Sequence, residues 1–462
     1  MPTFLNKYYP VRKILFFLGE SLLIFTTFLC VTLAATGWRI FVLDLLQVSI
    51  RATVVTIIFQ ITLYLFDLYD LKKTPEATAD TAVRMVQSFG VGCVILGLIY
   101  YLLPSLIIST KIFWWAYVIV CGVLLAWRAL YYIILKNKYF TKEIVIVGTG
   151  EMAAKIHQEM CADQECGFNL LAFVLGSRQP SFQLEGIPLL PDLAALEQQQ
   201  FAHRIKHIVV ALDNRRGTMP IPELLEHKLQ QMGIEDGIAF YEGLTGKLLV
   251  ENVNPAWLIF SDGFACGWLT ALLKRLMDIT MAILVLVCSL PFCLLTALLI
   301  KLESPGPIFY RQERVGLRGR NFQVIKFRSM RNDAEKNGAV WASKDDARVT
   351  RVGGFIRKVR IDEIPQIWNV IKGEMSFVGP RPERPVFVEQ LLRSIPYYSL
   401  RHFAKPGLTG WAQVCYPYGA SELDALRKLE YDLYYIKNQS IFLDLLIIFR
   451  TVKTVLFRKG SR

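Results

Sequence analysis

Charged residues are scarce in this chain of 462 residues, and the residue patterns that hold a structural metal are missing. Only 20% of the residues are charged against 53% hydrophobic, and the mean hydropathy is +0.36. This balance is too apolar for an ordinary soluble protein, so membrane segments are expected. The nine cysteines have no metal-like spacing and the five histidines are scattered. The sequence therefore argues against a structural metal site.

Positive charge exceeds negative charge by 13, and much of the excess lies in one stretch. Residues 301–360 contain 15 Lys/Arg and 6 Asp/Glu. Such a stretch suits nucleic acid, anionic lipid or the phosphates of a small substrate. No segment reads as a nucleic-acid-binding fold, and the basic stretch directly follows an apolar segment. We therefore expect lipid headgroups and a phosphorylated substrate as partners, and no nucleic acid.

Four long apolar runs open the sequence, at about 13–36, 42–67, 84–103 and 112–135. Each approaches or exceeds the ~20 residues that cross a bilayer as a helix. The first run is too long for a cleaved signal peptide and lacks a small-residue cleavage site. These runs predict a four-helix transmembrane bundle over residues 1–138.

The orientation of the bundle follows from its flanking positive charges. Basic residues precede the first run, surround the loop after the second and follow the fourth, whereas the other two loops contain only Arg39 and Lys111. The positive-inside rule then places the N-terminus in the cytoplasm, and four crossings return the chain there. Everything after the bundle is expected on the cytoplasmic side.

After the fourth run the pattern changes to alternating strands and helices. The β-branched run 143–147 predicts a buried strand, with further strands at 170–175 and 207–212 and a helix at 223–232. This alternation predicts a parallel sheet in a Rossmann-like α/β module over residues 139–255.

A glycine turn follows the first of these strands. Residues 148–153 read GTGEMA and fit the G-x-G-x-x-A dinucleotide fingerprint between a strand and a helix. The second strand, however, ends without the acidic residue that would bind a ribose. Two interpretations stay open: a regulatory or dimerising module that kept its tight turn, or a nucleotide site at Gly148 and Gly150.

A fifth apolar segment, residues 281–300, contains no charged residue. Pro291 lies in its middle, where proline kinks a helix. Basic residues lie on both sides, so the positive-inside rule places both ends in the cytoplasm. We therefore predict a re-entrant helix hairpin over about 277–301, because an ordinary crossing would put the following basic residues outside.

A dense series of polar motifs follows. In order they read SPGPIFYRQ (304–312), RVG (314–316), FQVIKFRSM (322–330), DDARVTRVG (345–353), FIRK (355–358), RIDEIP (360–365), SFVGPRPE (376–383) and KPGLTGWAQV (405–414). This series resembles the catalytic domain of the bacterial polyprenyl-phosphate hexose-1-phosphate transferases, the monotopic phosphoglycosyl transferases of polysaccharide initiation. The resemblance predicts an α-rich catalytic domain over 268–462. More loosely, the first half of the chain resembles that of the family's large members.

Transfer of a sugar phosphate requires particular residue types in an active site. The enzyme must hold a diphosphate, neutralise its charge and supply a nucleophile for attack on phosphorus. A carboxylate can be that nucleophile, and Mg²⁺, with its hard oxygen ligands, would bridge it to the diphosphate. Asp362 and Glu363 are adjacent carboxylates among several basic residues.

The resemblance implies a role for each of these residues. Asp362 matches the nucleophile, which would form a covalent phosphosugar-aspartate intermediate, and Glu363 matches its partner at the Mg²⁺ site. Arg381 and Arg357 match arginines expected to bind substrate phosphate, and Arg360, a basic neighbour of the two carboxylates, is expected to bind it as well. The residues that match the family's hairpin anchors are Lys274, Arg275 and Asp278.

Structural interpretations compete with these roles. Asp362 precedes Pro365 in an apparent first helical turn, so its side chain could be an N-cap. Glu363 could be a surface charge and Arg381 a solvent-facing arginine in a turn. The amphipathic stretch 441–457 suits either a helix in the membrane interface or a core helix.

The implied activity is transfer of a sugar 1-phosphate from a UDP-sugar to undecaprenyl phosphate, a polyprenyl phosphate, with release of UMP. It would take place at the cytoplasmic face of the bacterial inner membrane, as the first membrane step of exopolysaccharide, capsule or O-antigen synthesis. Glucose, galactose and N-acetylated sugars all fit. The alternative is a membrane scaffold or regulator with a nucleotide-sensing module and an inactive transferase domain. A homodimer formed through the N-terminal half is also expected.

Overall fold

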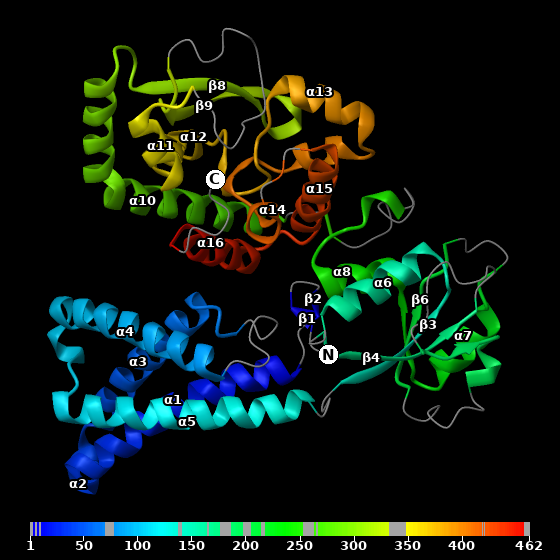
Figure 1. The fold of residues 1–462 in the computed structure, drawn as a ribbon, viewed down its shortest axis with the longest axis horizontal. Coiled ribbons are helices and arrows are strands. Elements are labelled where there is room, and N and C mark those ends of the chain that lie inside the picture. The colour runs from blue at the N-terminus through cyan, green and yellow to red at the C-terminus, as the bar shows by residue number, and fades with distance from the viewer. Residues whose placement is uncertain are drawn as a thin grey trace. The chain divides into compact units, whose positions relative to one another are not determined.

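The computed structural model describes residues 3–4, 7–8, 11–69, 78–136, 141–163, 166–175, 186–196, 205–213, 218–252, 263–264, 267–331, 348–417, 419 and 421–456. The chain divides into two compact units, the first comprising mainly residues 8–240 and the second mainly residues 241–462 (Figure 1). Each unit is described by itself.

Long apolar helices form the first part of the first unit. They are α1 (Val11–Thr36), the short α2 (Trp38–Leu43), α3 (Leu45–Leu65), α4 (Thr78–Leu102) and α5 (Thr110–Lys136). Helices α1, α3, α4 and α5 lie side by side around one core that contains Phe28, Phe59 and Phe89 (Figure 1). Their outer faces also expose large apolar side chains, as suits helices surrounded by lipid. The predicted apolar runs fall on these four helices.

One buried ion pair joins two of these helices. Glu20 of α1 lies 2.7 Å from the Arg128 guanidinium of α5, and both side chains are buried. Arg128 also donates to the Leu68 carbonyl just after α3, at 2.8 Å. Because an unpaired charge is costly in an apolar setting, this pairing constrains how the helices associate.

A parallel sheet forms the second part of the first unit. Its strands are β3 (Lys142–Val147), β4 (Phe168–Val174), β5 (Leu189–Leu190), β6 (His207–Val210) and β7 (Gly233–Asp236), in the order β5-β4-β3-β6-β7. The central strand β3 is buried over residues 144–147 because it pairs on both edges and is covered on both faces. Helices α6 (Glu151–Ala162) and α7 (Ile221–Leu229) connect the strands. The prediction of a parallel α/β sheet is confirmed.

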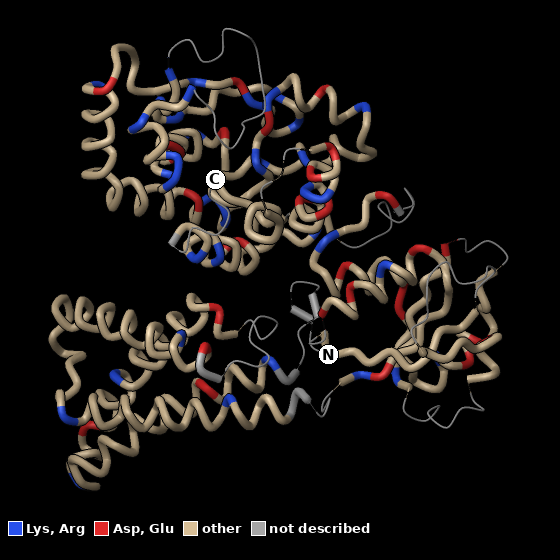
Figure 2. Tube along the Cα trace, in the orientation of Figure 1, with Lys and Arg blue, Asp and Glu red and all other residues tan. Residues whose placement is uncertain are grey.

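The second unit begins within α8 (Gly237–Thr245) and contains one further long helix, α10 (Trp268–Glu303). Pro291 lies inside α10, and Figure 1 shows the helix sharply bent between two straight runs. A proline lacks the N–H that the helical ladder needs and crowds the preceding turn, which accounts for the bend. In Figure 2 the long apolar helices carry few charged residues. Over the described residues, α1, α3, α4, α5 and α10 are long and apolar enough to cross a membrane.

Strands, 3₁₀ helices and helices of 5 to 16 residues follow in the second unit. They are the antiparallel pair β8 (Phe309–Val315) and β9 (Asn321–Phe327), helices α11 (Arg351–Lys358), α12 (Ile367–Lys372), α13 (Pro385–Ser394), α14 (Trp411–Cys415), α15 (Glu422–Lys437) and α16 (Ile441–Leu456), the 3₁₀ helices η7 (Ile361–Gln366) and η8 (Tyr398–Phe403), and the parallel pair β10 (Ser376–Val378) and β11 (Gly407–Thr409). The core packs α10 and α12 against β9, with Ala282, Val324 and Val370 at its centre. This packing places η7 against β9 and α11.

Candidate active site

The two adjacent carboxylates lie on η7, immediately after a left-handed residue. Arg360 has φ 62° and occupies the N-cap position, and no side chain caps the helix. Asp362 lies inside the first turn of η7. The interpretation of Asp362 as an N-cap is therefore wrong, because the left-handed turn at Arg360 begins the helix earlier than Pro365 suggested.

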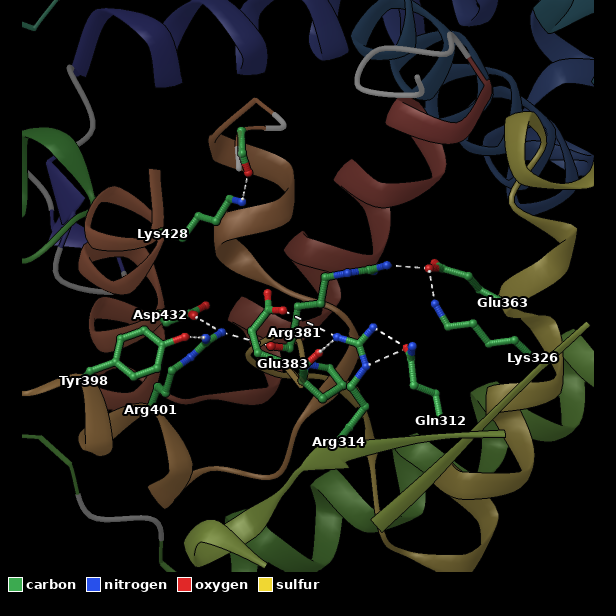
Figure 3. A network of polar contacts seen from close by, with 12 residues as sticks. Gln312, Arg314, Lys326, Glu363, Arg381, Glu383, Tyr398, Arg401, Lys428 and Asp432 are labelled. Carbon is green, nitrogen blue, oxygen red and sulfur yellow. Dashed lines mark hydrogen bonds and ion pairs between the residues drawn. The ribbon is translucent and has the colours of Figure 1, made fainter. Parts of the chain in front are cut away.

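Glu363 is held by cations from three parts of the chain, two of which, Arg381 and Lys326, are labelled in Figure 3. Its Oε1 accepts from Arg381 Nη2 at 2.5 Å and from Lys326 Nζ at 3.3 Å, and its Oε2 lies 3.7 Å from Arg360 Nη1. Burial alone would raise the pKa of this carboxyl, but the charges of Arg381 and Lys326 outweigh it and hold the pKa of Glu363 well below its ordinary value. Glu363 is thus a fixed negative charge.

Asp362 is in the opposite situation. Its side chain is 8% exposed, and no residue in the described part of the chain bonds to its carboxylate. Burial, followed by the charge of Glu363, raises the pKa of Asp362 to about 6, while Lys326, Arg357 and Arg381 act in the opposite direction. Two neighbouring carboxyls whose pKa values are pushed apart are typical of an active site with divided roles.

The predicted phosphate-binding arginines surround this pair. Arg381 and Arg360 have side chains 35% and 38% exposed, so both are partly accessible. Arg357 is in the last turn of α11, where its charge acts on Asp362. The structure therefore brings all three arginines to one site with Asp362 and Glu363.

Lys326 belongs to the same site, although the sequence analysis gave it no role. It is one lysine within the apolar run of β9, between Ile325 and Phe327. Lys326 is the only charged residue of β9 (NFQVIKF), and a lone charge among Val324, Ile325 and Phe327 is the signal that could have identified it. Burial lowers the pKa of Lys326, and the charge of Glu363 opposes that change.

The fit of Mg²⁺ can be tested on these carboxylates. No group of three or more His, Cys, Asp and Glu side chains gathers in the described ranges. Proteins commonly hold Mg²⁺ through one or two carboxylates together with substrate phosphates and water. Asp362 fits that mode because nothing described occupies its oxygens, whereas Glu363 is already bound by Arg381 and Lys326. Of the two carboxylates, Asp362 is therefore the one that fits a Mg²⁺ ion whose other ligands come from a diphosphate and water.

The predicted hairpin anchors tie the start of α10 to the rest of the second unit. Lys274 is buried and donates to Asp444 at 2.7 Å, to the Tyr435 hydroxyl at 3.1 Å and to the Val378 carbonyl at 3.1 Å. These partners come from α16, α15 and β10. One lysine therefore joins α10 to three elements of the domain.

Two more residues of α10 strengthen this attachment. Arg275 donates to two carbonyls in the last turn of α12, both at 2.7 Å, where a cation also complements the helix dipole. Asp278 accepts from Ser376 Oγ and from the Phe377 amide, both at 2.9 Å. The strand that leads into the Arg381 segment is thus fixed directly to α10.

At the glycine turn of the first unit, a side chain of the protein itself lies where a nucleotide phosphate would bind. The carboxylate of Asp213 accepts from the amides of Glu151 and Met152, at 3.0 and 3.2 Å, and so lies on the N-terminus of α6. A side chain at Gly150 would collide with Asp213, and one at Gly148 would collide with the Ala211 carbonyl. Close approach of the β6 loop is therefore enough to require both glycines, and nucleotide binding there stays a prediction.

Comparisons with known proteins match both halves of the chain. The sequence pattern of the bacterial sugar transferase family covers residues 269–458, and that of a CoA-binding domain covers residues 64–225. The UDP-N-acetylgalactosamine-undecaprenyl-phosphate N-acetylgalactosaminephosphotransferase of Aeromonas hydrophila is 48% identical over 48% of this chain. The matched segment spans about half of that relative, 52% of its length.

Two relatives match over a longer range. The UDP-glucose:undecaprenyl-phosphate glucose-1-phosphate transferase of Xanthomonas campestris pv. campestris is 32% identical over 69% of this chain and 68% of its own length. The UDP-galactose-lipid carrier transferase of Erwinia amylovora is 30% identical over 71% of this chain and 70% of its own length. These similarities extend beyond the catalytic domain and confirm the resemblance drawn from the motif series: the chain belongs to the bacterial sugar transferase family.

Proposed function

We propose that this protein transfers a sugar 1-phosphate from a UDP-sugar to undecaprenyl phosphate and releases UMP. The observation that carries the proposal is the arrangement on η7. Asp362 is buried without a bonded partner in the described structure, beside Glu363 held by Arg381 and Lys326. The acceptor class is inferred from the relatives, whose names include undecaprenyl phosphate or a lipid carrier.

The reaction runs in two displacements on phosphorus. In the first, a carboxylate oxygen of Asp362 attacks the phosphorus that bears the sugar, and the bond to the bridging oxygen breaks so that UMP leaves. In the second, a phosphate oxygen of undecaprenyl phosphate attacks the same phosphorus and the bond to Asp362 breaks. The products are undecaprenyl-diphosphate sugar and the free carboxylate, so the covalent intermediate divides one transfer into two steps.

The cations around Asp362 serve both displacements. Arg381, Arg360 and Arg357 bind the diphosphate oxygens and offset the charge that gathers there. Glu363 keeps Arg381 in place and, because it stays ionised, raises the pKa of Asp362, which makes the ionised Asp362 more basic. When bound, Mg²⁺ would neutralise further charge on the diphosphate.

The membrane supplies the acceptor, and the arrangement of the chain fits that source. Helices α1, α3, α4 and α5 would span the bacterial inner membrane as a four-helix bundle with a cytoplasmic N-terminus. The bend at Pro291 and the basic residues on both flanks support a re-entrant α10 whose two ends meet the cytoplasm. The Lys274 and Asp278 anchors would then hold the site at the bilayer surface.

The experiment supplies undecaprenyl phosphate, Mg²⁺ and a panel of UDP-sugars to the purified full-length protein and measures UMP. Of the three relatives described, the one with the highest identity carries N-acetylgalactosamine in its name, so UDP-N-acetylgalactosamine comes first, before UDP-glucose and UDP-galactose. UMP release with one donor is expected. No release with any donor would refute the proposal.

A further inference from the structure

The segment that presents Arg381 has little secondary structure of its own. Residues 380–383 form an irregular connection between β10 and α13. Two of the four are prolines, which have no N–H to donate. The segment can therefore be fixed through the backbone chiefly by what its carbonyls accept.

Each of these four carbonyls is held by a donor distant in the sequence. From residue 380 to residue 383 the donors are the Gly407 amide at 2.9 Å, the Arg401 guanidinium at 2.9 Å, the Arg314 guanidinium at 3.0 Å and the Val315 amide at 2.9 Å. Two of the four donors are side chains. The two central carbonyls, those of Arg381 and Pro382, accept from guanidinium groups and not from backbone amides.

Arg401 is itself locked in place. Its Nη2 also donates to Asp432 of α15 at 2.9 Å, and its Nη1 donates to the Tyr398 hydroxyl at 2.5 Å. All three side chains are at most 8% exposed. Burying a guanidinium and a carboxylate carries a desolvation cost that an apolar pair would avoid, so stability alone is a poor reason for this pair.

Arg314 approaches the segment from β8. Its Nη1 lies 3.4 Å from Glu383 Oε2, and its Nε and Nη2 donate to Gln312 Oε1 at 3.1 and 2.6 Å. Figure 3 shows the Arg381 side chain pointing toward Glu363, with Arg401 and Arg314 reaching the chain around Arg381. The guanidinium at the active site is thus borne on a backbone held by two other guanidinium groups.

We propose that Arg401 and Arg314 are positioning residues that hold the Arg381 and Pro382 carbonyls so that the Arg381 guanidinium meets Glu363 beside the nucleophile. The inference rests on the proposed function, since it matters for turnover only if Asp362 reacts. The groups that face Asp362 are Glu363, Lys326 from β9, Arg357 from α11 and Arg381. Of these four groups, only Arg381 lies on the backbone segment whose carbonyls accept from Arg401 and Arg314.

The test is the dependence of kcat/KM on pH for Arg401→Met and Arg401→Lys. The acid limb is the acidic side of the pH profile, where kcat/KM falls as Asp362 is protonated. A loosened Arg381 lowers the pKa of Asp362 less, so this limb moves from near pH 6 to higher pH. Arg401→Met is expected to lose about 100-fold in kcat/KM, the usual cost of misplacing a catalytic group by about 1 Å. Arg401→Lys, which keeps the charge but cannot keep all three contacts of the guanidinium, should fall between Arg401→Met and wild type.

Lys437→Met is the matched control. Lys437 lies on α15, as Asp432 does, and forms an equally buried ion pair with Glu242 at 2.6 Å. Breaking that pair should reduce thermal stability to a similar extent without moving the acid limb. A limb that moves equally in Lys437→Met and Arg401→Met would overturn the positioning role.

The remaining outcomes are also decisive. An Arg401→Met protein that keeps the wild-type limb and turnover refutes the inference while leaving the proposed function standing. If that variant does not fold, Arg314→Gln replaces it, because the Arg314 side chain is 17% exposed and its loss leaves no buried partner as enclosed as Asp432. An unmoved limb in Arg314→Gln then refutes the inference. Wild-type protein that releases no UMP refutes the proposed function itself.

Discussion

Each unit of this protein has an aspartate beside a turn, and the hydrogen bonding of the two carboxylates is opposite. In the α/β module, Asp213 accepts two amide hydrogen bonds at the N-terminus of α6, which satisfies both the carboxylate and the helix end. In the catalytic unit, Asp362 is buried on η7 with no bonded partner in the described structure. The first carboxylate has the surroundings of a structural cap and the second does not.

This difference indicates where to look for chemistry. A carboxylate that is largely desolvated and lies beside a second negative charge costs stability, so its presence calls for an explanation other than folding. The glycine turn has the sequence fingerprint of a ligand site, yet a side chain of the protein already lies on its helix end. The η7 turn matches no general fingerprint, yet it presents an unpartnered carboxylate among cations. The contact pattern, more than the motif, separates the two.

The largest expected effect is that of Asp362→Asn. UMP release should fall at least about 1000-fold, because the amide cannot attack phosphorus. The same change removes a buried charge, so the free energy of unfolding at pH 7 should rise by roughly 1–3 kcal/mol. Rate measurements and thermal unfolding on one preparation test both, and near-normal turnover would remove Asp362 as the nucleophile.

The next largest effect is expected for Glu363→Gln. It leaves Arg381 and Lys326 without their shared partner, so both stability and turnover should fall, the former by about 3–5 kcal/mol. Because the charge of Glu363 raises the pKa of Asp362, the acid limb of any remaining activity should move to lower pH. This shift is opposite in direction to the one expected for Arg401→Met. A limb displaced upward would contradict the assigned electrostatics.

In the wild-type protein, turnover should depend on pH through Asp362. The carboxyl must be ionised to attack, so activity should fall about tenfold per pH unit below about 6. The folded pKa lies above the ordinary 3.8, so between these values the folded state binds more protons than the unfolded state. Acidification through that window should therefore favour folding at this residue even as activity is lost. Comparing rate and unfolding profiles of wild type and Asp362→Asn isolates this contribution.

The smallest effect is expected for Asp213→Ala. Losing a carboxylate at a helix N-terminus should cost about 1 kcal/mol of stability, and UMP release should stay unchanged. Asp213→Asn, which keeps an acceptor, is the matched control and should lose less. A drop in turnover with unchanged stability would instead give the module a regulatory role.

The sequence predicted the architecture well because each of its signals is local. Apolar runs predicted the long helices, and strand–helix alternation predicted the parallel sheet. The short strands β5 and β7 were missed, since two to four residues at a sheet edge leave little pattern. The left-handed Arg360 was missed as well, because a non-glycine residue with positive φ has no reliable signature.

The site was predicted only as a set of residues, without its electrostatics. The motif series identified Asp362, Glu363 and the arginines, but burial, pairing and pKa depend on contacts between distant segments. Lys326 and Arg401 are 37 and 38 residues from Glu363, on opposite sides of it in the sequence. No local pattern links them to the carboxylates. Their roles follow only from the fold.

The covalent intermediate on Asp362 is tested most directly by the intact mass of the protein. Wild type and Asp362→Asn are each mixed with the UDP-sugar that supports turnover, without undecaprenyl phosphate, and quenched at once. Wild type should gain the mass of one sugar phosphate, located at Asp362 by peptide mapping, with one UMP released per site. Asp362→Asn should gain nothing. Wild-type protein that turns over with acceptor, yet forms no adduct and releases no UMP without it, would contradict a covalent mechanism.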